Sequence, residues 1–219
     1  ALSNGQRVTT FVELDFLLDK SGNEVVSNSY NPRLRHAFLK TGNWTFGQTW
    51  STFMNVGALP DTVDFVGVSE GTVFNRQAQV RYSTGNWQFA LENPETTMVN
   101  AGASAGVGTT DDAELPDIVA RYNLKGEHHQ LSVAAIARQL SWKNGAADDA
   151  AIDESSQAFG VNFAGKLNIG ADDIRFSLTS GQVARYVGLG SAADASLVDG
   201  ELEATDVTAA FVAYRHFWN

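Results

Sequence analysis

The residues of this sequence best suited to chemistry are its arginines, ten in number against five lysines. A guanidinium stays charged at neutral pH and offers a planar fork of donors that matches a carboxylate. Residues two positions apart in a strand point to the same side, and we assign six arginines of alternating segments to the polar side: Arg33, Arg35, Arg81, Arg121, Arg138 and Arg175. This pattern predicts a basic, hydrated face that attracts small anions.

Four further residues belong to the predicted hydrated face by alternation: Gln77, Gln79, Glu13 and Asp15. We predict that they line the same water-filled space as the arginines. For any single arginine there is an alternative, a neutralising ion pair across strands with Glu13, Asp15 or Glu92.

Asp61 and Asp64 follow Pro60 in a segment between two alternating runs. If this segment folded into the barrel, its carboxylates would face the basic side and create a transverse field that orients dipolar solutes. Acids beside a proline are also typical of turns, which is the alternative.

The sequence carries no pattern typical of a catalytic or cofactor site. It has no cysteine and none of the GxSxG, HExxH, phosphate-loop or dinucleotide signatures. The sequence has ten strand-like segments, a number that is also typical of omptin-like outer-membrane proteases. His128 and His129, however, adjoin a short turn, away from the rim expected for such an active site. The pairs of acidic residues between the strand-like segments do not have the spacing of an EF-hand calcium site. We therefore predict no enzyme, no cofactor and no bound metal.

Ten segments with a period of two residues would position these side chains. In the first, Val8, Val12 and Leu14 alternate with Glu13 and Asp15, so one face is apolar and the other charged. The segments are 8–18, 33–41, 43–50, 72–82, 86–93, 118–124, 128–140, 157–167, 174–182 and 207–217. A helical period is nowhere sustained. The predicted class is all-β, an antiparallel up-and-down barrel.

The connections between these segments alternate strictly between short and long. The short turns are 41–43, 83–86, 125–127 and 168–171, and the long connections are 19–31, 51–71, 94–117, 141–156 and 183–206. In a meander every second connection lies at the same end, so all short turns share one end. Of the 25 acids, 19 fall in the long connections. This polarity is typical of transmembrane β-barrels.

The apolar faces need either a protein core or lipid. A formal charge of −10 argues against a nucleic-acid partner, and 43% hydrophobic residues are enough for either a core or a lipid face. Strands of roughly 9 to 11 residues favour a membrane barrel. So do two predicted aromatic girdles, with Trp44, Trp87 and Tyr82 beside short turns and Trp50 and Trp142 near long connections. The alternative is a soluble, secreted all-β ligand-binding domain.

Five stretches of the first half resemble the DcaP-like outer-membrane porins: RLRHAF (33–38), GQTWSTFM (47–54), ALPDTVDF (58–65), RQAQVRY (76–82) and ALENPET (90–96). Further on, the strand pattern and the closing YRHFW (214–218) are similar. The resemblance implies homotrimeric barrels of about sixteen strands in the bacterial outer membrane, in contact with lipid and lipopolysaccharide. It also implies passage of small anions such as dicarboxylates. By the same resemblance, residues 51–71 fold into the lumen, and Arg33 and Arg35 stand at the constriction.

Ten strands are visible in the sequence, whereas open aqueous channels usually take about sixteen. We therefore expect residues 1–219 to form a single barrel domain that lacks strands at both ends; the alternative is a complete ten-stranded barrel. The predicted function is that of a porin, through which small hydrophilic anions diffuse passively along an arginine-lined lumen.

Overall fold

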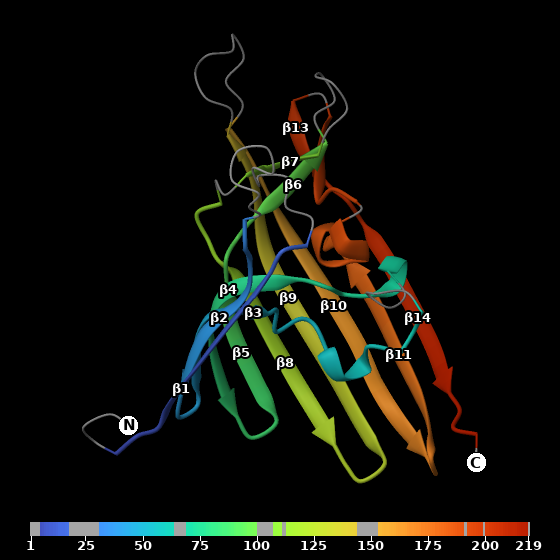
Figure 1. Cartoon of the computed structure of the whole chain (residues 1–219). Helices are drawn as coiled ribbons and strands as arrows, with labels where there is room; N and C mark the ends of the chain where they lie inside the picture. The colour runs from blue at the N-terminus through green and yellow to red at the C-terminus, as the bar shows by residue number, and fades with distance from the viewer. Residues whose placement is uncertain are drawn as a thin grey trace, which may run out of the picture.

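The computed structural model describes residues 5–17, 31–63, 69–99, 107–110, 113–143, 153–190, 192–198 and 200–218. Ten strands form one antiparallel sheet, in which each pairs with the next of the ten along the chain (Figure 1). They are β1 (Val8–Asp15), β2 (Arg33–Thr41), β3 (Trp44–Trp50), β4 (Arg76–Thr84), β5 (Trp87–Glu92), β8 (Asp117–Lys125), β9 (His129–Lys143), β10 (Asp153–Ile169), β11 (Asp172–Gly181) and β14 (Val207–Arg215). The predicted all-β meander is confirmed. No helix in these ranges is long and apolar enough to cross a membrane.

Short turns and long connections lie at opposite ends of the sheet, as predicted. The hairpins β2–β3, β4–β5 and β10–β11 turn at Gly42, Gly85 and Gly170, whose φ angles are 54°, 54° and 63°. Glycine adopts a positive φ without a steric penalty, so these residues make tight turns possible. β8 and β9 meet in a fourth short turn at the same end (Figure 1).

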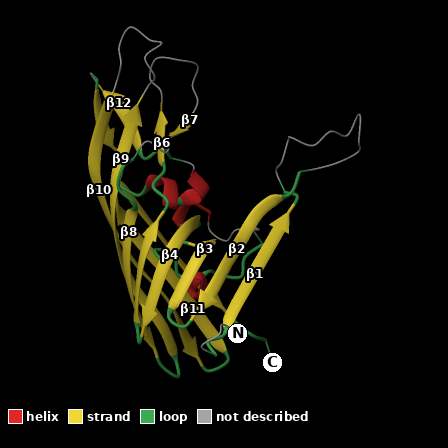
Figure 2. Cartoon of the chain, turned by 90° about the vertical axis from the view of Figure 1, so that its left-hand side faces the viewer, coloured by secondary structure: helices red, strands yellow, loops and turns green. Residues whose placement is uncertain are grey.

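The long connections carry a second, smaller sheet that the sequence pattern did not reveal. It consists of β6 (Thr96–Val99), β7 (Val107–Thr110), β12 (Ala195–Val198) and β13 (Glu201–Ala204), and lies beyond the ten-stranded wall (Figure 2). β12 pairs in parallel with β6, although a long stretch of chain separates them. Such short strands leave no periodic signal. A buried cluster of Met98, Leu140, Ala158, Ala195 and Leu202 joins this sheet to β9 and β10.

The ten-stranded sheet curls, but its two edges do not meet. Among the described residues, β1 pairs with β2 alone and β14 with β11 alone. Figure 2 shows the curled sheet with β1 at its free edge. The predicted barrel is therefore present as an open wall.

The two faces of the wall differ in chemistry because alternate residues of each strand point to opposite sides. The outer face carries exposed apolar side chains, among them Phe46, Val80, Phe89, Leu91, Ile118, Val133, Phe159, Val161, Phe163, Leu178 and Val212. The inner face carries the polar series, in register from Thr45 and Arg81 to Asn162 and Thr179.

Two connections fold onto the inner face. The first inner segment (residues 51–63 and 69–75) contains η1 (Val56–Ala58) and η2 (Ser69–Gly71), and the second inner segment (residues 182–190) contains η3 (Ala184–Tyr186) and η4 (Gly188–Gly190). A β-bridge between Val73 and Val187 joins the two segments. Their apolar side chains and those of the wall form one buried cluster, which includes Phe53, Met54, Val119, Ile136 and Tyr186.

Candidate functional site

Three arginines of the sheet bind the first inner segment. Arg121 on β8 and Arg175 on β11 donate to the carbonyl oxygens of Met54 and Leu59, and Arg81 on β4 donates to the Thr52 hydroxyl at 2.8 Å and to the carbonyl oxygen of Trp50, which ends β3. A carbonyl oxygen satisfies a guanidinium N–H group but carries no charge that cancels it. These predicted pore-lining residues therefore face inward and also anchor the segment.

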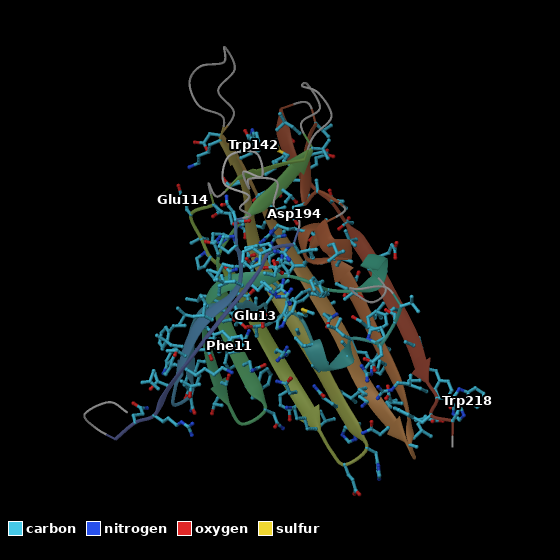
Figure 3. All side chains as sticks on the ribbon, in the orientation of Figure 1. Phe11, Glu13, Glu114, Trp142, Asp194 and Trp218 are labelled. Carbon is cyan, nitrogen blue, oxygen red and sulfur yellow. The ribbon has the colours of Figure 1, made fainter. Side chains whose placement is uncertain are left out.

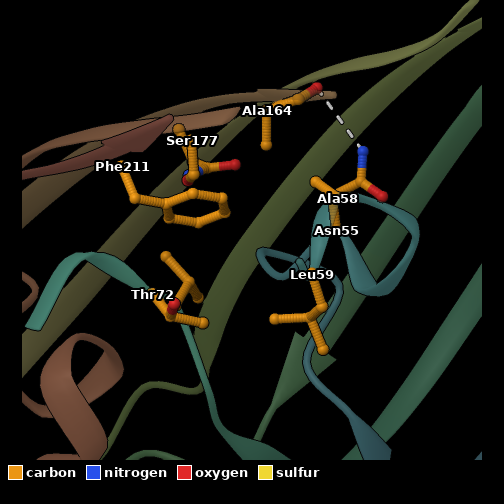
Figure 4. A pocket seen from close by; sticks show the side chains of 9 residues that line it. Asn55, Ala58, Leu59, Thr72, Ala164, Ser177 and Phe211 are labelled. Atoms are coloured by element: carbon orange, nitrogen blue, oxygen red, sulfur yellow. Dashed lines mark hydrogen bonds between the residues drawn. The ribbon is translucent and has the colours of Figure 1, made fainter. Parts of the chain in front are cut away.

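Along the whole first inner segment, polar groups of the segment form hydrogen bonds with polar groups of the sheet. Glu92 on β5 is buried and accepts hydrogen bonds from the Ser51 hydroxyl at 2.7 Å and from the Thr52 amide at 2.6 Å. At the far side of the sheet, Asn55 donates to the Ala164 carbonyl oxygen at 3.5 Å (Figure 4). The segment is thus attached to the wall at both sides of the curled sheet.

Gln77 and Gln79 on β4 face inward, as predicted, but the inner segments cover them, with 4% and 5% of their surface exposed. Gln79 accepts a hydrogen bond from the Thr52 hydroxyl at 3.1 Å, and the Gln77 amide lies 3.0 Å from the Tyr186 hydroxyl. Both side chains hold the inner segments in place.

Arg138 on β9 lies at the centre of a buried ionic network. Its guanidinium donates to Asp194 at 2.6 Å, to Asp117 at 3.1 Å and to the carbonyl oxygen of Glu95 at 2.7 Å. The side chains of Arg138 and both aspartates are 0% exposed. Alternation predicted an arginine that lines open water. The structure differs because residues of the long connections, Glu95 and Asp194 (the latter labelled in Figure 3), bind Arg138 and cover it.

The second inner segment completes this network. The Tyr186 hydroxyl donates to Asp117 at 2.7 Å, and the Arg185 amide donates to Asp194 at 3.0 Å. Burial raises the pKa of Asp194, but the hydrogen bonds and charge of Arg138 outweigh burial and hold that pKa below its usual value. Asp194 therefore stays ionised and binds its connection to the wall.

Arg33 and Arg35 lie on the edge hairpin β1–β2 and keep 40% and 23% of their side chains exposed. Arg33 binds both carboxylate oxygens of Asp15, at 2.9 and 2.7 Å. Arg35 binds Glu13 at 2.5 Å and Asp15 at 3.0 Å. A β-bulge leaves Arg35 without an opposite residue on β1, which turns it toward the same side as the acids. The predicted arginines and acids thus meet as paired, partly exposed charges.

A row of long polar side chains, here called the short-turn row, crosses the inner face near the short turns. Lys125, Gln130, Lys166 and Arg175 stand opposite one another on β8, β9, β10 and β11. Arg175 is paired with Asp173 at 2.9 Å and with Asp61 of the first inner segment at 3.1 Å. Asp61 therefore lies against basic residues. Asp64 lies outside the described residues.

Aromatic residues pair beside the short turns on the outer face. The ring centroids of Trp44 and Tyr82 lie 4.8 Å apart, and those of Trp87 and Tyr122 lie 4.9 Å apart. Trp44 and Trp87 are 44% and 46% exposed. This placement is the one expected of an interfacial girdle.

The two tryptophans near the long connections have other surroundings. Trp142 packs against the buried cluster that contains Leu140. Trp50 lies under the Arg76 guanidinium, 3.7 Å from its ring centroid, and in edge contact with Phe74. Trp142 thus packs inside the fold, whereas Trp50 keeps the outward register of Trp44 and Phe46 on β3, so the second girdle stays a prediction.

Sequence reasoning missed the second inner segment and with it Arg185. The available signal was the apolar group Val183, Tyr186 and Val187 in a connection otherwise rich in acids and glycine. It also left out Lys166, which strand alternation places on the same face as Arg175.

A family model described as DcaP outer membrane protein matches residues 2–204. Among solved structures, the chain is similar to the crystal structure of the outer membrane channel DcaP of Acinetobacter baumannii, with a TM-score of 0.72 and 23% sequence identity. The similarity covers 96% of this chain and 57% of that one. At this identity the likeness concerns the fold. No curated protein matches the chain.

Proposed function

The chain belongs to the DcaP outer membrane protein family, and from this premise we propose that it forms the wall of a diffusion channel for small, hydrophilic, anionic solutes. Its location is the bacterial outer membrane. The proposal treats residues 1–219 as one barrel-forming domain, with residues 51–71 as the constriction. Solutes would move down their own gradients without a cofactor.

The observation that carries the proposal is the reversed polarity of the sheet. Val133, Val161 and Phe163 on the outer face are 54%, 55% and 43% exposed. A soluble sandwich or lipocalin-like barrel would bury such residues at its centre, whereas a lipid bilayer accepts them on the outside. The soluble binding domain is therefore the weaker alternative.

The charges on the inner face favour anions as the solutes. Inward strand positions carry the cations Arg33, Arg35, Lys40, Arg81, Arg121, Lys125, Arg138, Lys166, Arg175 and Arg215, against the acids Glu13, Asp15, Glu92, Asp117, Glu154 and Asp173. Cations thus outnumber acids on this face, although the whole chain has a formal charge of −10. A lumen of positive potential concentrates anions and repels cations.

Two separate basic groups suit solutes that carry two carboxylates. One is the pair Arg33 and Arg35 on the edge hairpin, and the other is the short-turn row. A partly exposed ion pair contributes only about 0–1 kcal/mol, so a passing carboxylate can replace Asp15 or Glu13 at little cost. We therefore propose dicarboxylate-like anions as the preferred class.

The partners of the protein follow from the same premise. The outer apolar face would contact membrane lipid, and the end with the long connections would contact lipopolysaccharide. A homotrimer is the proposed assembly.

Removal of the edge arginines tests the selectivity. Arg33→Ala combined with Arg35→Ala leaves Glu13 and Asp15 without their partners. We therefore expect the reversal potential, measured across a planar bilayer in a salt gradient, to move toward cation preference. The double variant Glu13→Gln with Asp15→Asn is the matched control and should move it in the opposite direction.

Native protein extracted from the outer membrane is the reference for both variants. It should show stepwise conductance and a reversal potential that favours anions. If neither double variant changes the reversal potential, the charges of Arg33, Arg35, Glu13 and Asp15 do not determine the ion selectivity. If the native protein shows no conductance, the channel function is excluded.

A further inference from the structure

The inner face is hollowed at the short-turn end of β4, β5 and β8. The hollow is open to solvent and has a volume of about 170 Å³. Every side chain that lines it is polar: Ser83, Asn86, Gln88, Arg121, Asn123 and Lys125.

Two cations, Arg121 and Lys125, face this hollow, and none of its lining residues is acidic. Arg121 donates to two neutral oxygens, the Met54 carbonyl and the Gln88 side chain. Its Nε is buried and has no partner within the described ranges. Among the described residues, Lys143 and Lys166 form ion pairs, whereas Lys125 forms none.

Glu92 is the acid whose charge acts on Arg121. It does not line the hollow, because it is buried and accepts hydrogen bonds from Ser51 and Thr52. Gln88 accepts from both Arg121 and Asn123, which fixes the guanidinium against the wall. The positive charge is therefore held in place at the hollow.

A second basic hollow, on β11 and β14, is different in this respect. There Asp173 and Asp61 each contact both Arg175 and Arg215. Those acids compensate the arginines before a solute arrives. Of these two hollows, only the one at Arg121 and Lys125 therefore has cations that no lining acid compensates.

We propose that the hollow at Arg121 and Lys125 is a carboxylate-binding site on the short-turn side of the constriction. It would hold an anion that enters or leaves the channel at the periplasmic end, where transmembrane barrels have their short turns. The two cations supply the attraction, and the Ser83 hydroxyl is a further donor. The open, polar lining suits weak and rapid binding. This inference rests on the proposed channel function.

Lys125 is the residue to change, because Arg121 also anchors the first inner segment. Succinate is added to one side of a planar bilayer that contains the native protein, and the rate of current interruptions is counted. We expect Lys125→Glu to lower this rate about three- to tenfold for succinate from the short-turn side, since a nearby charge mainly changes the rate of entry. From the other side the change should stay below about twofold. Lys125→Arg should behave as the native protein.

Lys143→Glu is the matched control, because it makes the same charge change on a partly exposed lysine at the opposite end. It should leave interruptions from the short-turn side unchanged. If Lys125→Glu changes the interruption rate equally from both sides, or does not change it, the proposed binding site is wrong, but the proposed channel function is unaffected. A native protein that prefers cations overturns the proposed function itself.

Discussion

Arg33 and Arg138 are both strand arginines bound to aspartate, but solvent reaches only one of them. The Arg33 side chain is 40% exposed, so its ion pair contributes about 0–1 kcal/mol. The Arg138 side chain is 0% exposed, as are those of Asp117 and Asp194. Loss of one partner from such a buried group leaves a charge that water cannot stabilise. The first pair can exchange with a passing anion, whereas the second belongs to the frame that holds the connections.

Arg138→Gln should therefore destabilise the folded protein by about 3–5 kcal/mol, because Asp117 and Asp194 lose their compensating charge. Denaturant unfolding in detergent, followed by tryptophan fluorescence, measures this loss. Lys143→Gln, on the same strand but 40% exposed, removes the same charge and should cost less than about 1 kcal/mol. Similar losses in the two variants would mean that the network contributes no more than a surface ion pair.

Among the structural elements, the second inner segment depends on Gly160 of β10 for its close approach to the wall. A Cβ atom at Gly160 would clash with Cγ1 of Val183 and would lie 3.3 Å from Cγ2 of Ile136. Val183 is 0% exposed and therefore has no free space into which to move. The missing side chain at Gly160 leaves room for the segment that carries Tyr186.

Gly160→Ala should destabilise the protein by about 1–3 kcal/mol through overpacking against Val183. Val183→Ala removes the colliding methyl groups, so the double variant should lose less stability than the sum of the two single changes. Unfolding of the native protein and the three variants in detergent gives the coupling energy. Strictly additive losses would show that the two positions do not interact.

For the molecule as a whole, the medium around the outer face distinguishes a membrane wall from a soluble sheet. Val161 and Ile169 are both aliphatic residues of the outer face of β10, and each is 55% exposed. Val161 lies at the middle of β10, whereas Ile169 ends this strand beside the turn at Gly170. In a bilayer these positions differ in depth, and the cost of a charge depends on depth.

Val161→Arg should destabilise the protein in lipid vesicles by about 2–4 kcal/mol, and Ile169→Arg by about 0–1 kcal/mol. Denaturant unfolding from vesicles, again followed by tryptophan fluorescence, compares the two variants directly. The same small cost at both positions would indicate that water, not hydrocarbon, surrounds the outer face.

The sequence by itself determined the ten strands, their two faces and the ends at which they turn. Alternation along a strand is a local property, so the side on which Val133 or Arg81 lies follows from its immediate neighbours. The turns at Gly42 and Gly85 are local for the same reason, since a positive φ favours glycine whatever the rest of the fold does. The residues of the outer and inner faces could therefore be predicted from the sequence without knowledge of the tertiary structure.

Tertiary structure alone decided which inward arginines reach water. Arg33 and Arg138 have the same strand pattern, but the folded connections cover Arg138 and leave Arg33 partly exposed. The bulge at Arg35 and the contact of Gly160 with the second inner segment likewise depend on residues far apart in the chain. Such contacts form only when the whole sheet has curled, and a period of two residues carries no information about what will pack on either face.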